Sequence, residues 1–281
     1  MIYHKNSFVL QHTAILKYKT IFRQDIMKTV YGPVASWRLG KSLGVDLICS
    51  PKKICSFDCT YCQLEKTEKI TSKRDTFVSI EKVGEEVKNA IEHITPDVIT
   101  FSGTGEPTLA NNMNEAIETI RGLTNIPLAI LTNSSLLYDE NVQKTLHNLD
   151  IIVAKLDAPN QELFQKISHP AEGITFEKTL RGIKAMKKEF HGKFSLQIMF
   201  INENKNHANE LAELSRKIEP DEIQINTPLR PCAVSPLSKK ELDNIEKSFT
   251  GLNTISVYHS TKPMTDPLDK IELFKRRGME I

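Results

Sequence analysis

The sequence predicts an α/β fold, specifically a partial (β/α)6 barrel, and three observations support that prediction. Short apolar runs alternate with amphipathic stretches, as in a parallel sheet covered by helices. The runs are nearly continuous in Val, Ile, Leu and Phe, which is typical of strands buried on both faces. The β-then-α order recurs about six times, fewer than the eight units of a closed barrel, so we expect an open side for a substrate. A doubly wound open sheet has the same order of elements and remains the alternative.

The apolar runs give the strands in order, and residues at helical spacing give the helices between them. The first predicted helix places Ile80, Val83 and Val87 on one face. Strands are predicted at residues 44–48, 97–102, 127–132, 151–156, 194–201 and 222–226. Helices are predicted at residues 79–93, 175–190 and 208–218. This order places the barrel in residues 27–230.

The two ends of the chain differ in pattern from the barrel. Residues 1–26 are basic, and Met27 stands directly before a better-patterned stretch, so we expect 1–26 to be a non-native or disordered extension. Residues 231–281 are interrupted by proline, then helical, and end in a basic stretch that we interpret as a solvated face. We expect 231–281 to form a C-terminal helical tail or a truncated accessory module.

Composition excludes several classes of protein. Of 281 residues, 40% are hydrophobic and 26% charged, and no apolar run approaches the roughly 20 residues of a membrane span. The formal net charge of +2 is too small to indicate nucleic-acid or membrane binding by itself. Three of the five cysteines lie within eight residues, which favours metal chemistry in a reducing compartment. We therefore expect a cytoplasmic protein that does not bind membranes.

Cys55, Cys59 and Cys62 form a CxxxCxxC motif directly after a predicted strand. Thiolates are the preferred ligands of iron–sulfur clusters, and three ligands on one tight loop would leave the fourth iron of a cubane open for reaction. A structural zinc site usually takes four ligands, and the nearest further cysteine is Cys49, upstream of the loop. A non-catalytic module that uses the same cysteines for an iron–sulfur cluster or for zinc therefore stays open as an alternative.

The cysteine motif, with aromatic Tyr61 before its last cysteine, resembles the cluster loop of the radical S-adenosylmethionine (SAM) superfamily. One strand later, residues 103–108 read GTGEPT, similar to the family's GGE element but with Thr104 and a second glycine interposed. Gly103 and Gly105 let the backbone approach a ligand, and Glu106 is an acceptor for an ammonium group. The resemblance implies a [4Fe–4S] cluster and SAM as cofactors, with Glu106 and its adjacent backbone binding the amino group of SAM.

The resemblance extends over residues 29–231, through YGPVASWRLGKSLGVDL, CQLEKT, TNSSLL, KLDAP and QINTPLRP. These segments resemble a branch of radical SAM proteins loosely called Fe–S oxidoreductases or grouped with the tRNA wyosine synthesis enzyme. The resemblance implies that a reduced cluster cleaves SAM to methionine and a 5′-deoxyadenosyl radical, which abstracts hydrogen from substrate. It also implies an external electron donor such as flavodoxin or ferredoxin. An RNA base and a peptide are the two substrate classes that stay open.

Further candidate site residues are polar side chains in or after the later strands, whose carboxyl ends form the active face of a parallel barrel. By the resemblance, those of the third to fifth strands contact the carboxylate, ribose and adenine of SAM, and Tyr61 touches the adenine. Each could instead be an ordinary strand-end polar residue, and Lys155 could simply pair with Asp157. The set is Asn133, Lys155, Asp157, Gln197 and Asn226.

Three basic residues and two cysteines complete the candidates. Arg38, Lys41 and Arg230 could hold an anionic group of the substrate, although single basic residues are mostly solvated. Cys49 and Cys232 are expected to be inert thiols. Cys232 follows the last barrel strand, where a thiol could alternatively donate a hydrogen atom or bind a second metal.

Overall fold

The computed structural model describes residues 27–277, so the extension predicted at 1–26 and the last residues of the predicted tail lie outside the described residues. An eight-stranded sheet runs in the order β1-β2-β5-β6-β7-β8-β9-β10. The β1–β2 pair is antiparallel, and every other neighbouring pair is parallel. The strands are β1 (Val30–Ser36), β2 (Gly40–Val45), β5 (Val98–Phe101), β6 (Leu128–Thr132), β7 (Ile151–Lys155), β8 (Lys193–Met199), β9 (Glu222–Asn226) and β10 (Thr254–Ser256).

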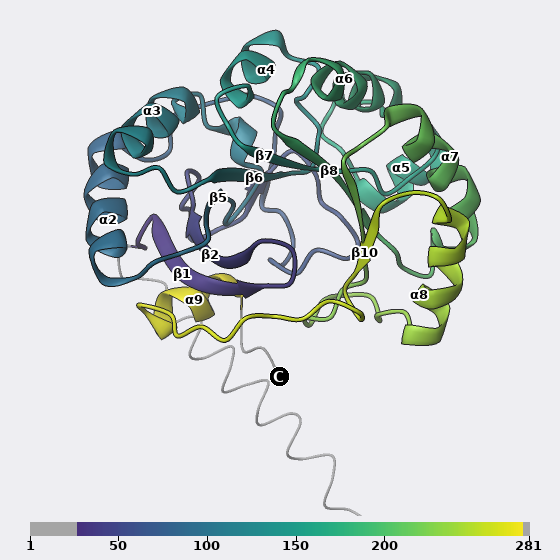
Figure 1. The fold of residues 1–281 in the computed structure, drawn as a ribbon. Coiled ribbons are helices and arrows are strands. Elements are labelled where there is room, and N and C mark those ends of the chain that lie inside the picture. Colours follow the sequence, from purple (N-terminus) through teal and green to yellow (C-terminus); the bar gives the residue numbers. More distant parts are fainter. Residues whose placement is uncertain (1–26, 278–281) are drawn as a thin grey trace, which may run out of the picture.

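The sheet curls into a half-barrel, and helices surround its outer side (Figure 1). Ser79 caps α2 and Thr175 caps α6, each accepting a backbone N–H of the first turn, as helix-starting residues do. Because the helices cover one face only, the partial barrel prediction is confirmed and the doubly wound alternative is wrong. The helices are α2 (Ile80–His93), α3 (Met113–Leu123), α4 (Glu140–Leu146), α5 (Gln161–Ser168), α6 (Phe176–Glu189), α7 (Ala208–Ile218), α8 (Lys239–Glu246) and α9 (Lys270–Arg277).

The main hydrophobic core lies between the sheet and the helices. Leu43, Ile99 and Ile130 are fully buried there, on three neighbouring strands, and Val83 and Val87 of α2 pack into the same cluster. Burying such side chains is the main favourable term in folding, which fixes the strand ends relative to one another. The inner side of the half-barrel is left to polar residues.

The first predicted strand is shifted in the structure. β2 begins at Gly40 and ends at Val45, so residues 46–48 are not strand. The Asp46 carboxylate explains the early end, because it accepts the backbone N–H groups of Ile48 (3.1 Å) and Cys49 (2.9 Å) and turns the chain. Sequence analysis also missed β1, which pairs with β2 as a hairpin, and β10, which is only three residues long.

The segment after β10 crosses the open side of the half-barrel and ends in α9, against β1 (Figure 1). We call residues 257–269 the strap. The backbone N–H of Leu268 donates to the carbonyl of Gly32 over 2.8 Å, which fastens the strap to β1. The strap thus joins the two edges of the sheet. Among the described residues, no helix combines the length and the apolarity needed to cross a bilayer.

Candidate active site

The cysteine loop lies between β2 and α2, and its backbone is fixed by local hydrogen bonds. Thr67 donates its backbone N–H to Asp58 Oδ1 (2.7 Å) and its hydroxyl to the Phe57 carbonyl (2.8 Å). Two short strands, β3 (Ile54–Cys55) and β4 (Lys69–Ile70), pair in parallel across the loop. The ring of Phe57 packs edge-on against Phe164 at 5.4 Å, which anchors the loop in a second apolar cluster. The cysteine loop is therefore held in one conformation by its own hydrogen bonds and packing.

Cys55, Cys59 and Cys62 converge on this loop in surroundings that disfavour bare thiolates. Burial raises the pKa of Cys55 to about 11 and that of Cys59 to about 12. Lys53 lies beside them: burial lowers the pKa of Lys53, but the neighbouring Cys62 and Cys55 raise it more, so its ammonium stays charged. A positively charged metal group that binds the three thiolates would offset the cost of burying their negative charge.

The spacing of the three sulfur atoms distinguishes a site for an iron–sulfur cluster from a site for a single metal ion. The three Sγ atoms do not all lie within 4.8 Å of one another. Around one zinc ion, with Zn–S bonds of about 2.3 Å in a tetrahedron, sulfurs sit roughly 3.8 Å apart. The donor set, three thiolates on one loop, therefore fits a [4Fe–4S] cluster better than zinc.

The GTGEPT turn after β5 comes so close to the cysteine loop that two of its positions need glycine. A Cβ on Gly103 would lie 2.0 Å from Cγ of Asp46, and a Cβ on Gly105 would lie 1.7 Å from the carbonyl oxygen of Ile54. Ile54 and Gly105 also form a parallel bridge. Any side chain at Gly105 would push the turn away from the loop that carries Cys55.

The departure at Thr104 has a structural reason. The backbone N–H and the hydroxyl of Thr104 both donate to Asp46 Oδ2, each over 3.0 Å. The same hydroxyl accepts the backbone N–H of Ser50 over 3.1 Å. Thr104 thus ties the turn both to the end of β2 and to the start of the cysteine loop, a link that glycine could not make.

Glu106 is buried and its two oxygens are engaged unequally. Oε1 accepts three hydrogen bonds, from the Thr108 backbone (3.1 Å), the Thr108 hydroxyl (2.7 Å) and the Thr132 hydroxyl (2.7 Å). Oε2 accepts one, from the Asn133 backbone (2.7 Å). A carboxylate oxygen has about two acceptor positions, so Oε2 can accept a further donor. Burial raises the pKa of Glu106 despite these bonds, and a cationic donor would offset that effect.

Tyr61, Lys155 and Asp157 form one hydrogen-bonded group at the end of β7. The Tyr61 hydroxyl donates to Asp157 Oδ2, and Lys155 Nζ donates to the Tyr61 hydroxyl over 2.8 Å. Lys155 Nζ also lies 3.7 Å from Asp157 Oδ2 and 4.2 Å from the centroid of the Tyr61 ring. The predicted pairing of Lys155 with Asp157 is therefore present, but Tyr61 links both of them to the cysteine loop.

Of the remaining predicted residues, Asn133 is hydrogen-bonded to the cysteine loop, whereas Gln197 and Asn226 are buried strand residues without such a bond. Asn133 Nδ2 donates to Ser56 Oγ (2.8 Å) and lies 3.6 Å from Cys55 Sγ, so it joins the end of β6 to the cysteine loop. Gln197 is buried next to Lys155 in the β7–β8 register. Asn226 is buried, and its Oδ1 accepts the neighbouring Thr227 N–H over 2.9 Å. Within the described chain, neither Gln197 nor Asn226 hydrogen-bonds through its side chain to the other predicted residues.

A buried ion-pair network that sequence analysis missed connects α9 to the turn. Arg276 Nε lies 3.3 Å from Asp46 Oδ2, the atom that also binds Thr104, and Arg276 Nη1 lies 2.8 Å from Glu272 Oε2. The Arg276 side chain is 1% exposed and its guanidinium sits 4.8 Å from the Tyr31 ring centroid. The basic end of the chain was interpreted as a solvated face; at Arg276 that interpretation is wrong.

Of the two isolated cysteines, Cys49 contacts the distant helix α9, since Arg276 Nη2 lies 3.7 Å from its Sγ. Cys49 Sγ lies 3.4 Å from the Lys28 carbonyl, and burial raises the pKa of Cys49 to about 11. Cys232 Sγ donates to the Val234 carbonyl over 3.1 Å. Both sets of contacts suit unreactive thiols, and the alternative roles of Cys232 stay predictions.

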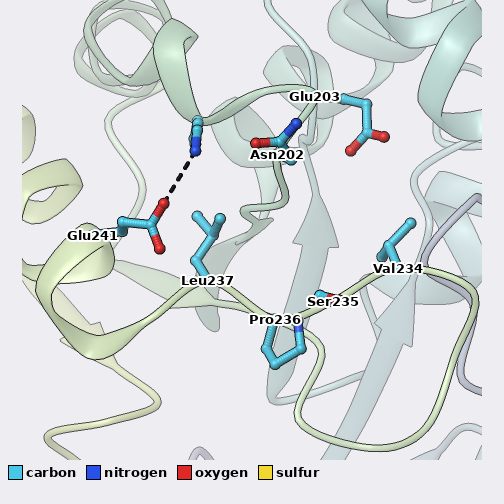
Figure 2. Close-up of a pocket in the computed structure, with 8 residues that line it drawn as sticks. Asn202, Glu203, Val234, Ser235, Pro236, Leu237 and Glu241 are labelled. Atoms are coloured by element: carbon cyan, nitrogen blue, oxygen red, sulfur yellow. Dashed lines mark hydrogen bonds and ion pairs between the residues drawn. The ribbon is translucent and has the colours of Figure 1, made fainter.

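A pocket of about 430 Å³ lies beside the carboxyl ends of β8 and β9 (Figure 2). Its walls come from the loop after β8, with Asn202 and Glu203, and from the loop after β9, with Leu237. The dashed line in Figure 2 marks Lys205 and Glu241, paired over 3.0 Å at one end. Glu203 Oε2 is buried and has no hydrogen-bond partner in the described part of the chain.

Comparison with known proteins identifies the family. Residues 50–215, which contain the cysteine loop and the GTGEPT turn, match the model of the radical SAM superfamily. The chain belongs to the radical SAM superfamily. It is 41% identical over 203 residues to a UPF0026 protein of Synechocystis sp., covering 72% of this chain and 76% of that protein. It is 34% identical over 237 residues to a protein named GTPase Obg of Brachyspira hyodysenteriae, covering 82% of this chain but only 35% of that protein.

A solved structure shares the fold of this radical SAM protein. SuiB of Streptococcus suis, bound to its precursor peptide SuiA, superposes with a TM-score of 0.61 at 14% identity, over 89% of this chain and 53% of that one. Members of the superfamily bind a [4Fe–4S] cluster and SAM, so this chain is a radical SAM enzyme with those cofactors. The alternative of a non-catalytic iron–sulfur or zinc module is therefore wrong.

Proposed function

We propose that this protein positions SAM and a substrate for radical chemistry: a [4Fe–4S] cluster, when bound and reduced, would supply the electron for cleavage of SAM to methionine and a 5′-deoxyadenosyl radical, which would abstract hydrogen from the substrate. Cys55, Cys59 and Cys62 would hold the cluster and leave one iron for SAM. Glu106 would accept the SAM ammonium through Oε2, the oxygen with acceptor capacity left. The protein's part in this reaction is to position the reactants and to keep water away from them.

One observation supports this proposal most strongly: the thiol loop and the buried carboxylate are locked together. The Ile54–Gly105 bridge holds the turn of Glu106 against the loop of Cys55, and Asn133 contacts both. A ligand that binds the open iron and also offers an ammonium group would satisfy both elements at once. Tyr61, held between Lys155 and Asp157, would border the same ligand.

Anaerobic reconstitution tests the proposal. The iron-loaded, dithionite-reduced protein should show a [4Fe–4S] electron paramagnetic resonance signal that SAM perturbs, and it should form 5′-deoxyadenosine. A Cys59→Ala protein carried through the same procedure controls for iron bound elsewhere. A reduced cluster whose signal SAM does not change, with no 5′-deoxyadenosine formed, would refute the proposal.

The electron donor, the compartment and the substrate follow as parts of the same proposal. A low-potential carrier such as flavodoxin or ferredoxin would reduce the cluster, and the cytoplasm keeps free thiols such as Cys49 reduced. Of the two substrate classes, an RNA base is favoured over a neutral peptide, because arginines from three segments gather near the cysteine loop. Comparing tRNA nucleosides and peptides between deletion and wild-type cells distinguishes the two classes.

A further inference from the structure

The tip of the β1–β2 hairpin carries a guanidinium whose hydrogen-bonding capacity is not used. Nε and Nη1 of Arg38 are buried, and neither has a hydrogen-bond partner among residues 27–277. The guanidinium carbon lies 5.5 Å from the centroid of the neighbouring Trp37 ring. Buried charged donors are costly when left unpaired, and proteins seldom leave them so. The position therefore calls for an acceptor that the described chain does not supply.

Two further arginines add positive charge around Arg38. Burial, and after it the charges of Arg277 and Arg230, lower the pKa of Arg38 to about 10. Glu222 acts in the opposite direction, but its carboxylate is already paired with Lys193 over 2.7 Å. Like charges brought together in this way disfavour the charged form unless an anion joins them. The local balance is positive and favours an anionic ligand.

The three guanidinium groups come from segments far apart in the sequence, and contacts tie them to the cysteine loop. Arg38 lies in the hairpin, Arg230 follows β9, and Arg277 ends α9 after the strap has crossed the open side (Figure 1). Arg230 Nη1 donates to the Arg277 carbonyl over 3.3 Å. Arg230 Nε donates to Oε1 of Gln63 over 3.1 Å, and Gln63 directly follows Cys62. The positive cluster therefore adjoins the loop where SAM would be cleaved.

We propose that Arg38, Arg230 and Arg277 form a receptor for an oxyanion, a phosphate or a carboxylate, carried by the substrate. The planar guanidinium presents paired N–H donors that match such groups in a bidentate manner, and it stays charged when buried. The assignment of the oxyanion to the substrate rests on the proposed function, because that function places the reacting atom beside the same loop. The receptor would orient the substrate from its charged end, leaving the bond to be broken toward the SAM site.

The protein contains its own reporter for this receptor. Trp37 is the single tryptophan of the chain and stacks near the Arg38 guanidinium, so its fluorescence should respond to an anion bound there. The cluster-loaded protein is titrated at constant ionic strength with inorganic phosphate in one arm and acetate in the other. We expect a saturable change in fluorescence, confirmed by calorimetry. The anion that binds more tightly tells whether the receptor takes phosphate or carboxylate.

Three variants of the same hairpin provide the contrast. Arg38→Gln should weaken anion binding by about tenfold or more, since it removes charge-assisted hydrogen bonds. Lys41→Gln removes an equal charge from an exposed position nearby and should change affinity less than about twofold. Arg38→Lys keeps the charge but lacks the paired N–H donors of the guanidinium, so its anion affinity should lie between those of Arg38→Gln and Lys41→Gln. Circular dichroism of each variant checks that it is folded.

The outcomes separate this inference from the proposed function. Absence of saturable binding of either anion, or equal losses in Arg38→Gln and Lys41→Gln, would overturn the receptor. Formation of 5′-deoxyadenosine by the wild-type protein is measured in the same samples. If an anion binds as expected but no 5′-deoxyadenosine forms, the receptor stands and the proposed function fails.

Discussion

Two sets of buried charged groups in the half-barrel differ in how they are satisfied. On the cysteine side, around Cys55 and Glu106, the carboxylate of Glu106 accepts four hydrogen bonds, and Asp157 binds both Tyr61 and the Met199 backbone. By contrast, buried atoms of Arg38 in the hairpin and of Glu203 in the loop after β8 have no hydrogen-bond partner in the described chain. The first set is organised in advance for a cofactor of fixed shape. The second leaves polar groups open, which is what a site for an outside molecule requires.

The largest effect should come from removing a thiol on the cysteine side. Cys59→Ala leaves only two of the three ligands, and we expect loss of the [4Fe–4S] absorbance and of all SAM cleavage. Iron and sulfide content after anaerobic reconstitution provide the measurement. Cys232→Ala, which removes a thiol bound only to the Val234 carbonyl, should keep the full cluster. Equal iron loss in both variants would contradict the assignment of the cysteine loop.

The second effect tests whether the cysteine side depends on the far end of the chain. Arg276→Gln removes the cation paired with the buried Asp46 carboxylate, while Glu272 keeps its pair with Lys275, and loss of one partner of a buried ion pair costs about 3–5 kcal/mol. We expect that loss in the free energy of unfolding by urea, together with weaker SAM binding, because Asp46 also holds Thr104.

An exposed ion pair between the strap and the first residue of the same helix is the matched control. Lys270 pairs with Asp266 over 3.6 Å, with side chains 79% and 86% exposed, so Lys270→Gln should cost less than about 0.5 kcal/mol. If both variants unfold at the same urea concentration, the buried network does not anchor the turn, and the two regions are independent.

The third effect addresses the cofactor site alone. Glu106→Gln removes a charged acceptor from a buried position, and hydrogen bonds to charged groups contribute about 1.5–3 kcal/mol, roughly a 10- to 150-fold change in affinity. We expect that loss in SAM binding to the reconstituted protein, measured by equilibrium dialysis, with cluster content unchanged. Glu118→Gln, exposed on α3, should bind SAM as the wild type does. Unchanged SAM affinity in Glu106→Gln would remove Glu106 from the site.

The cofactor site and the fold could be predicted from the sequence better than the contacts of the buried charged residues. The cysteines and Glu106 lie on two continuous segments, and the resemblance of both motifs to the radical SAM superfamily indicated the chemistry, which the cysteine spacing alone left open. The half-barrel was predictable because strands buried on both faces read as apolar runs. β1 was missed because Gly and Pro at positions 32 and 33 interrupt its pattern, and β10 because three residues carry no period.

Long-range contacts between charged residues were beyond sequence analysis. Arg276 and Asp46 are 230 residues apart, and one sequence contains no signal that pairs them. Lys53 was not among the predicted site residues, and only its burial beside Cys62 marks it as part of the site. Arg38 was singled out by charge, but its open donors become visible only when the hairpin and α9 are placed.

The smallest effect lies at the rim of the pocket in Figure 2. The Ser238 hydroxyl and backbone N–H, and then Lys205, lower the pKa of Glu241 to about 2. The depressed pKa means that ionised Glu241 stabilises the folded state above its ordinary pKa of about 4.5, and that this contribution is lost as pH falls through about 2. Glu241→Gln should therefore melt slightly below the wild type at pH 7, with the difference shrinking between about pH 4.5 and 2. Lys205→Gln keeps the hydrogen bonds between Ser238 and Glu241 and should lower the melting temperature less than Glu241→Gln does. A difference in melting temperature between the wild type and Glu241→Gln that grows as the pH falls would contradict the proposed cause.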